Sequence, residues 1–95
     1  ARLGEFLLAE LRALKRRFPF LGDVRGRGLM IGLDFGDPDH PQPDLRDKAV
    51  RLAFEKGLLL LPAGPSALRI APPLVLTQEE AALGLEILEE VFRAL

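Results

Sequence analysis

The sequence contains no cysteine, which excludes disulfide bonds and thiolate metal sites. It also lacks a long apolar run, because the longest, residues 58–63, is far too short to span a bilayer. The net charge of −1 gives no electrostatic attraction to nucleic acid or to an anionic membrane. No signal peptide is recognisable at the start of the sequence. We therefore expect a cytoplasmic protein that binds neither nucleic acid nor membranes.

The size and composition indicate one small folded unit. The chain has 95 residues, of which 48% are hydrophobic and 28% are charged, as in globular rather than disordered proteins. We predict a single domain over residues 1–95, with no repeat and no internal boundary. The first residue is alanine rather than methionine, from which we expect a fragment or a processed chain.

Hydrophobic periodicity predicts three helices. Leucines recur three or four residues apart over residues 2–17, and the second helix is predicted over residues 44–56, with Asp44 as its N-cap and Gly57 as its stop. The third follows a capping box, in which Thr77 caps the helix and the Glu80 side chain reaches back, and it runs nearly to the end of the chain.

One residue of the third helix is unexpected. Gly84 lies inside the helical pattern, where glycine costs about 1 kcal/mol relative to alanine. We therefore expect close packing against this position.

Three strands are predicted. Residues 29–35 alternate as a half-buried strand does, after a tight glycine-rich lead-in at residues 22–28. Residues 58–61 form a short apolar strand, expected to be covered on both faces, and residues 67–71 form the next strand after a turn at residues 62–66. The fold class is then α+β: a two-layer sandwich whose small three-stranded sheet is covered on one face by helices, with the last two strands adjacent. We expect the uncovered face to be an interface.

An arginine interrupts the last predicted strand. Arg69 lies between Leu68 and Ile70, and burying its charge without an anion would be costly. Its planar, five-donor group suits bidentate capture of a carboxylate, so we interpret Arg69 as a candidate substrate-binding residue. Two structural alternatives stay open, namely an ion pair with Asp34 on a neighbouring strand or simple exposure to solvent.

Two further arginines, Arg25 and Arg27, flank Gly26. They are compatible with a phosphate-binding nest or with a solvated turn. The glycines at positions 26, 28 and 32 do not match a dinucleotide-binding fingerprint, because the spacing is wrong by one and a strand follows where a helix should.

The remaining polar residues predict no complete active site. His40 is the only histidine and lies in a polar, proline-rich loop at residues 36–43, where a solvated side chain is expected rather than a ligand or base. Asp37 and Asp39 are too few to hold calcium, so no metal is expected. None of the lysines has the buried setting that a Schiff-base lysine needs; they are Lys15, Lys48 and Lys56.

Four segments together carry a family resemblance. In order they read DVRGRGLMIGLDF (residues 23–35), KGLLLLPAG (56–64), ALRIAPPLVLTQEE (67–80) and ALGLEILEEVF (82–92). They resemble the C-terminal segment of class III aminotransferases, which are pyridoxal-phosphate enzymes that act on ω-amino groups. The wording of the second segment is most similar to the 4-aminobutyrate aminotransferase branch, with ornithine and acetylornithine aminotransferases as close alternatives.

The resemblance implies a division of labour with residues outside this chain. The family is of fold type I and homodimeric, and it exchanges an amino group between a donor and a 2-oxo acid such as 2-oxoglutarate. Arg69 matches the family arginine that holds the substrate α-carboxylate. The cofactor lysine and the phosphate-binding residues would lie upstream, in the rest of the enzyme chain. The resemblance therefore implies that this chain alone neither binds pyridoxal phosphate nor transaminates.

Two readings from other classes remain. A small regulatory module that binds an anionic metabolite would also explain Arg69, and so would an interaction domain in which Arg69 is tied to Asp34. If the chain is separated from a larger enzyme, we further expect an exposed apolar patch or self-association.

Overall fold

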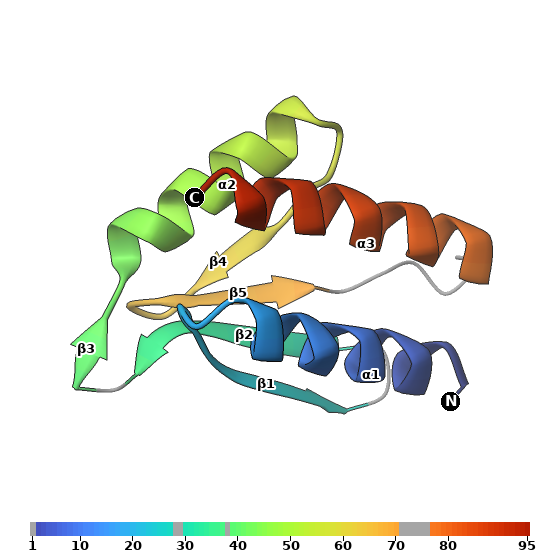
Figure 1. Ribbon diagram of the computed structural model, residues 1–95, viewed down its shortest axis with the longest axis horizontal. Helices are drawn as coiled ribbons and strands as arrows, with labels where there is room; N and C mark the ends of the chain where they lie inside the picture. The colour runs from blue at the N-terminus through green and yellow to red at the C-terminus, as the bar shows by residue number, and fades with distance from the viewer. Residues whose placement is uncertain (1, 28–29, 38, 71–76) are drawn as a thin grey trace.

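The computed structural model describes residues 2–27, 30–37, 39–70 and 77–95 of the chain (Figure 1). Its elements, in order, are α1 (Arg2–Arg17), β1 (Leu21–Arg27), β2 (Met30–Asp37), β3 (His40–Pro41), α2 (Pro43–Glu55), β4 (Leu61–Ala63), β5 (Ala67–Ile70) and α3 (Gln78–Arg93). The three helices pack on one side of an antiparallel sheet, so the predicted α+β class is confirmed. No helix in the described part of the chain is long and apolar enough to cross a membrane.

The sheet has more strands than predicted. Its strands lie in the order β1-β2-β5-β4, and the short β3 pairs separately with β2. The predicted lead-in at residues 22–28 is in fact most of β1. The sequence hides this strand because the register shifts between Leu21 and Asp23, which breaks the alternation that marks a strand. Leu21 and Val24 are therefore both buried although they are three residues apart.

The covered face of the sheet forms the core. Ile31, Leu33 and Phe35 of β2 are all at most 1% exposed, which confirms the predicted alternation over the described part of residues 29–35; Leu29 lies outside the described residues. An aromatic cluster joins the sheet to the helices, with ring centroids 5.5 to 6.0 Å apart; its members are Phe18, Phe20, Phe35 and Phe92. This core fixes one face of β2 and leaves the other face open.

Helices α1 and α3 agree with the prediction in type and extent. The Thr77 hydroxyl accepts from the backbone N–H of Glu80 at 3.1 Å, and the Glu80 carboxylate accepts from the backbone N–H of Thr77 at 3.1 Å, so the capping box is confirmed. Gly84 is different: a Cβ added there would meet only a Leu58 methyl carbon at 3.9 Å among the described residues. Among the described residues, close packing at Gly84 is therefore not seen.

Helix α2 begins one residue earlier than predicted and is capped differently. Its N-cap is Gln42, which makes no side-chain cap bond, and Pro43 occupies the first turn, so the prediction of Asp44 as N-cap is wrong. Proline suits the first helical position because its φ is already helical and its missing N–H would have no partner there. Gly57 follows the helix with a φ of +89°, a left-handed conformation that favours glycine.

The strand predicted at residues 58–61 lies further along, at β4. It pairs with β5, which confirms that these two strands are adjacent, and Pro62 stands opposite Leu68. Leu59 is 69% exposed and Leu61 is 46% exposed, so the expectation of cover on both faces is wrong. The reason is that Leu61 stands opposite Arg69 on the face that the helices do not cover, whereas Leu60 is only 1% exposed. Ala71, predicted as the last residue of the next strand, lies outside the described residues.

Candidate functional site

The open face of the sheet is organised in rows that run across the strands. Residues opposite one another in an antiparallel pair share a face. Arg25 of β1 stands opposite Gly32 of β2, Gly32 stands opposite Arg69 of β5, and Arg69 stands opposite Leu61 of β4. This row therefore places Arg25 on one side of Gly32 and Arg69 on the other.

A shallow groove with a volume of about 740 Å³ lies over this row. Its lining includes Arg25, Gly32, Asp34, Ser66 and Arg69. The groove is open to solvent, so a ligand could reach the charged groups from outside the sheet. It is the place where the sequence-predicted site residue and its nearest charged neighbours come together.

Arg69 presents its guanidinium on this open face. Its residue is exposed, whereas the next residue on each side faces the helices, with Leu68 fully buried and Ile70 partly buried. No ion pair or side-chain hydrogen bond joins Arg69 to another residue in the described part of the chain. The Arg69 donors are thus not engaged by the described residues and lie on the open face of the sheet.

Asp34 does not neutralise Arg69. Its carboxylate accepts from Arg25 Nη1 at 2.8 Å, and the register sets Asp34 opposite Ala67 rather than Arg69. The same Nη1 lies 3.3 Å from a carboxylate oxygen of Asp23. The hydrogen bond to Asp34 raises the pKa of Arg25 above its ordinary value, so this guanidinium stays charged and bound. The alternative of an Arg69–Asp34 ion pair is therefore wrong.

The pairing of Arg25 also corrects the expectation of a solvated turn around Gly26. Residues 25 and 26 lie within β1, and Arg25 is held by two carboxylates. The side chain of Arg27 lies outside the described residues. A Cβ at Gly32 would be 3.5 Å from Arg25 Cζ, Nε and Nη2, so the glycine gives Arg25 room to lie across β2.

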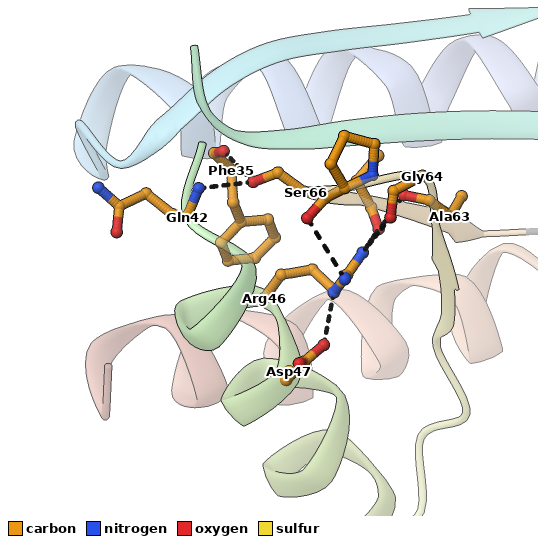
Figure 2. A network of polar contacts seen from close by, with 9 residues as sticks. Phe35, Gln42, Arg46, Asp47, Ala63, Gly64 and Ser66 are labelled. Carbon is orange, nitrogen blue, oxygen red and sulfur yellow. Dashed lines mark hydrogen bonds and ion pairs between the residues drawn. The ribbon is translucent and has the colours of Figure 1, made fainter. Parts of the chain in front are cut away.

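A second polar cluster, on the helix side of the sheet, was not predicted (Figure 2). Arg46 of α2 has a side chain only 9% exposed. Its Nη1 donates to the carbonyls of Ala63 at 3.2 Å, Gly64 at 3.2 Å and Ala67 at 2.9 Å. Its Nη2 lies 3.5 Å from the carbonyl of Pro65, and its Nε donates to Asp47 at 2.7 Å. We call Arg46 and these carbonyls the turn clamp.

A signal for Arg46 was present in the sequence. It lies three residues before Ala49 and seven before Ala53, which places a charged side chain on the apolar stripe of the helix. Burial of such a residue needs partners, and backbone carbonyls of a turn are suitable acceptors. What periodicity could not supply is which turn, because that contact spans about twenty residues of sequence.

Ser66 completes the cluster. Its hydroxyl donates to the carbonyl of Phe35 and accepts from the backbone N–H of Gln42 at 2.8 Å. The backbone N–H of Phe35 also donates to the carbonyl of Ser66 at 2.8 Å. Figure 2 shows the Ser66 hydroxyl bonded to both Phe35 and Gln42, so one turn residue joins β2 to the start of α2.

Of the other polar candidates, His40 and Asp37 contact each other. His40 is exposed and bonds Asp37 through both its backbone N–H and its ring. Desolvation opposes the effect, but these hydrogen bonds lower the pKa of Asp37 below its ordinary value. The described residues contain no group of three or more acidic or histidine side chains that could hold a metal ion.

The whole chain is similar to one enzyme family. A family description of class III aminotransferases matches residues 1–92. The alanine/serine racemase of Pyrococcus horikoshii is 44% identical over 96% of this chain and 20% of its own length. The 4-aminobutyrate aminotransferase GabT of Escherichia coli is 42% identical over 95% of this chain and 22% of its own length. The acetylornithine aminotransferase of Gloeobacter violaceus is 44% identical over 97% of this chain and 22% of its own length.

Solved structures give the same result. An amine transaminase from an uncultivated Pseudomonas species, determined in its pyridoxal-phosphate-bound form, superposes with a TM-score of 0.88 at 35% identity. The match covers 99% of this chain and 22% of the transaminase chain. This chain therefore spans about a fifth of the length of the curated relatives that it matches.

Proposed function

This chain belongs to the class III aminotransferase family, and we propose that it forms the C-terminal part of an enzyme that transfers an ω-amino group from a 4-aminobutyrate-like donor to 2-oxoglutarate. Its partners in that proposal are the remainder of the enzyme chain, a second copy of the full-length protein, and the amino-acid and 2-oxo-acid substrates. The similarity to GabT over nearly the whole chain supports this choice of donor.

Within that enzyme, Arg69 binds the substrate carboxylate. The observation that carries this proposal is the contrast within one row of the sheet. Arg25 is already bound by Asp34, whereas Arg69 has no ion-pair partner in the described part of the chain. A guanidinium and a carboxylate match in geometry, and two parallel charge-assisted hydrogen bonds fix the orientation of the substrate as well as holding it.

Class III aminotransferases use pyridoxal phosphate, but the residues of this chain do not fit that cofactor. The cofactor needs a lysine in a buried site, and all three lysines here are exposed on or next to helices. The ammonium of Lys56 lies 3.5 Å from a carboxylate oxygen of Glu90. We therefore place the cofactor-binding residues in the part of the enzyme outside this chain, and we assign none of the cofactor chemistry to the residues present.

Acetylornithine aminotransferase activity is the second candidate, supported by the 44% identity to the Gloeobacter enzyme. The donors of these relatives differ, but alanine, serine and 4-aminobutyrate all carry a carboxylate. A carboxylate-binding arginine would serve each of them. The choice between donors would then depend on residues outside this chain.

The experiment uses the full-length enzyme that contains this chain. Arg69→Ala should raise the KM for 2-oxoglutarate roughly 100-fold, because each charge-assisted hydrogen bond contributes about 1.5–3 kcal/mol. Arg69→Lys should recover only part of this, since an ammonium cannot make the bidentate contact. The matched control is Arg12→Ala, which removes an exposed arginine of α1.

Steady-state kinetics with 2-oxoglutarate and with each candidate donor would decide the matter. An unchanged KM and kcat for Arg69→Ala would refute the carboxylate-binding role. Comparison of kcat/KM for 4-aminobutyrate and acetylornithine would separate the two candidate donors.

A further inference from the structure

The turn clamp sits directly behind the strand that carries Arg69. Arg46 donates to the carbonyl of Ala67 at 2.9 Å, and Ala67 is the first residue of β5. Arg69 follows two residues later and faces the opposite side of the sheet from the core. The turn clamp therefore holds the first residue of β5, Ala67, while the Arg69 side chain stays exposed.

The clamp has a clear physical effect on the turn between β4 and β5. Four carbonyl oxygens of this turn converge on one side, where their partial negative charges would repel one another. A planar cation at the point of convergence replaces that repulsion by charge-assisted hydrogen bonds. These bonds, made by Arg46 from the side of α2 as Figure 2 shows, favour one conformation of the turn.

Strand pairing and turn contacts act together on β5. β5 pairs with β2 over all four of its residues and with the three-residue β4 on its other side. The Ser66 hydroxyl adds a link to β2 through the carbonyl of Phe35. The pairing with β2 thus sets the register of β5, and the contacts of Arg46 and Ser66 hold the turn end from which it starts.

We propose that Arg46 is a positioning residue for Arg69, acting through the β4–β5 turn, so that the Arg69 guanidinium is held where the substrate carboxylate arrives. This inference rests on the proposed carboxylate-binding role of Arg69. The Arg46 guanidinium reaches from α2 to the carbonyls of the turn, so it acts through the turn and does not contact the substrate in this proposal. Its contribution is geometric, because a bidentate contact is lost when the guanidinium is displaced by about 1 Å.

The test is a double-mutant cycle in the full-length enzyme. Arg46→Lys keeps the positive charge but cannot span four carbonyls and Asp47 with a single ammonium. We expect it to raise the KM for 2-oxoglutarate about tenfold, with a smaller change in kcat. In an Arg69→Ala background, the same substitution should change that KM by less than about twofold, because the contact that it positions is already gone.

Two further variants keep the test decisive. Arg46→Met removes the charge while keeping an unbranched side chain, and its fold is checked by circular dichroism and thermal unfolding; if it does not fold, Arg46→Lys carries the test. Arg51→Lys is the matched control, since Arg51 is an exposed arginine of the same helix, and it should leave the KM unchanged.

The outcomes separate the two proposals. If Arg46→Lys lowers the melting temperature but leaves the KM unchanged, Arg46 is structural only and the positioning role is overturned. The same holds if Arg46→Lys raises the KM by the same factor in the parent enzyme and in the Arg69→Ala variant. If Arg69→Ala alone has no effect, the carboxylate-binding role itself fails, which is a different result from the failure of the positioning role.

Discussion

The two faces of the sheet differ in what they do with the same kind of residue. On the covered face, β2 and β5 contribute side chains that are fully buried, and Arg46, the buried arginine of α2, is surrounded by carbonyl acceptors. On the open face, Arg69 and Leu61 remain accessible to solvent. The first face contributes mainly to stability and the second is suited to binding.

The comparison extends to the arginines of the open face. Arg25 and Arg69 occupy the same row, but Arg25 is held by Asp34 and Asp23. The charge of Arg25 is already balanced by two carboxylates at Nη1, whereas Arg69 stands opposite a glycine and a leucine that cannot balance its charge. Position in a row is therefore a poor guide to function unless the neighbouring carboxylates are also known.

The largest expected difference between the faces is in stability. Leu33→Ala removes a fully buried side chain from the core and should lower the free energy of unfolding by about 3 kcal/mol. Leu61→Ala, on the open face, should lower it by only about 0.5 kcal/mol. Urea unfolding of the parent chain and the two variants measures both values. Equal losses would show that the open face is also a core in solution.

Ser66 lies where the two faces meet and should show an intermediate effect. Ser66→Ala leaves the buried carbonyl of Phe35 without its hydroxyl donor and the N–H of Gln42 without its acceptor. We expect a loss of about 2 kcal/mol in the free energy of unfolding, measured in the same way. A loss below about 0.5 kcal/mol would mean that water replaces the hydroxyl without cost.

The ion pair of the open face should contribute less. The Arg25 and Asp34 side chains are 56% and 37% exposed, so the pair is screened by solvent. A double-mutant cycle with Arg25→Gln and Asp34→Asn should give a coupling of about 0.5 kcal/mol that decreases at high salt. A coupling above about 2 kcal/mol, insensitive to salt, would place the pair in a much less polar setting than the open face provides.

The smallest expected effect is pH-dependent and lies in the helical layer. Arg17 of α1 donates to Glu89 of α3 at 2.7 Å, and this hydrogen bond, with the charges of Arg17 and Arg93, lowers the pKa of Glu89 below its ordinary value of 4.5. The ionised carboxylate therefore favours the folded state. This contribution is fully present above about pH 4.5 and is lost as the pH falls through the lowered folded-state pKa.

Melting curves of the parent chain and of Glu89→Gln between about pH 7 and pH 3 would detect this contribution of the Glu89 carboxylate to stability. The parent should melt slightly higher near neutral pH, and the two curves should converge in acid. A difference that persists or grows in acid would assign it to packing instead of charge.

The sequence was sufficient for the helices and for the fold class. Periodicity located α1, and the capping box located the start of α3, because both signals are local. The N-cap of α2 was misassigned because Pro43 and Asp44 are both common in the first turn of a helix. Only the backbone conformation shows that the helix begins at Pro43. Strand β1 was missed because the bulge after Leu21 removes the period of two.

The candidate site was only partly predictable for a related reason. Arg69 was identifiable because a charged residue in an apolar strand is conspicuous. Whether Arg69 pairs with a carboxylate was not predictable, because this depends on strand register. A register shifted by two residues would have set Asp34 opposite Arg69 instead of Ala67. The turn clamp depends on a helix and a turn that meet only in the folded chain.

The edge strand β4 has a consequence for self-recognition between copies of the chain. It ends the sheet with only three residues, and one of them is Pro62. Proline has no N–H to offer to an incoming strand, so a second sheet cannot be added along this border by regular backbone pairing. The same short, interrupted border, whose turn contacts an arginine from α2, thus disfavours strand addition at the β4 edge, while β1 forms the other edge of the sheet.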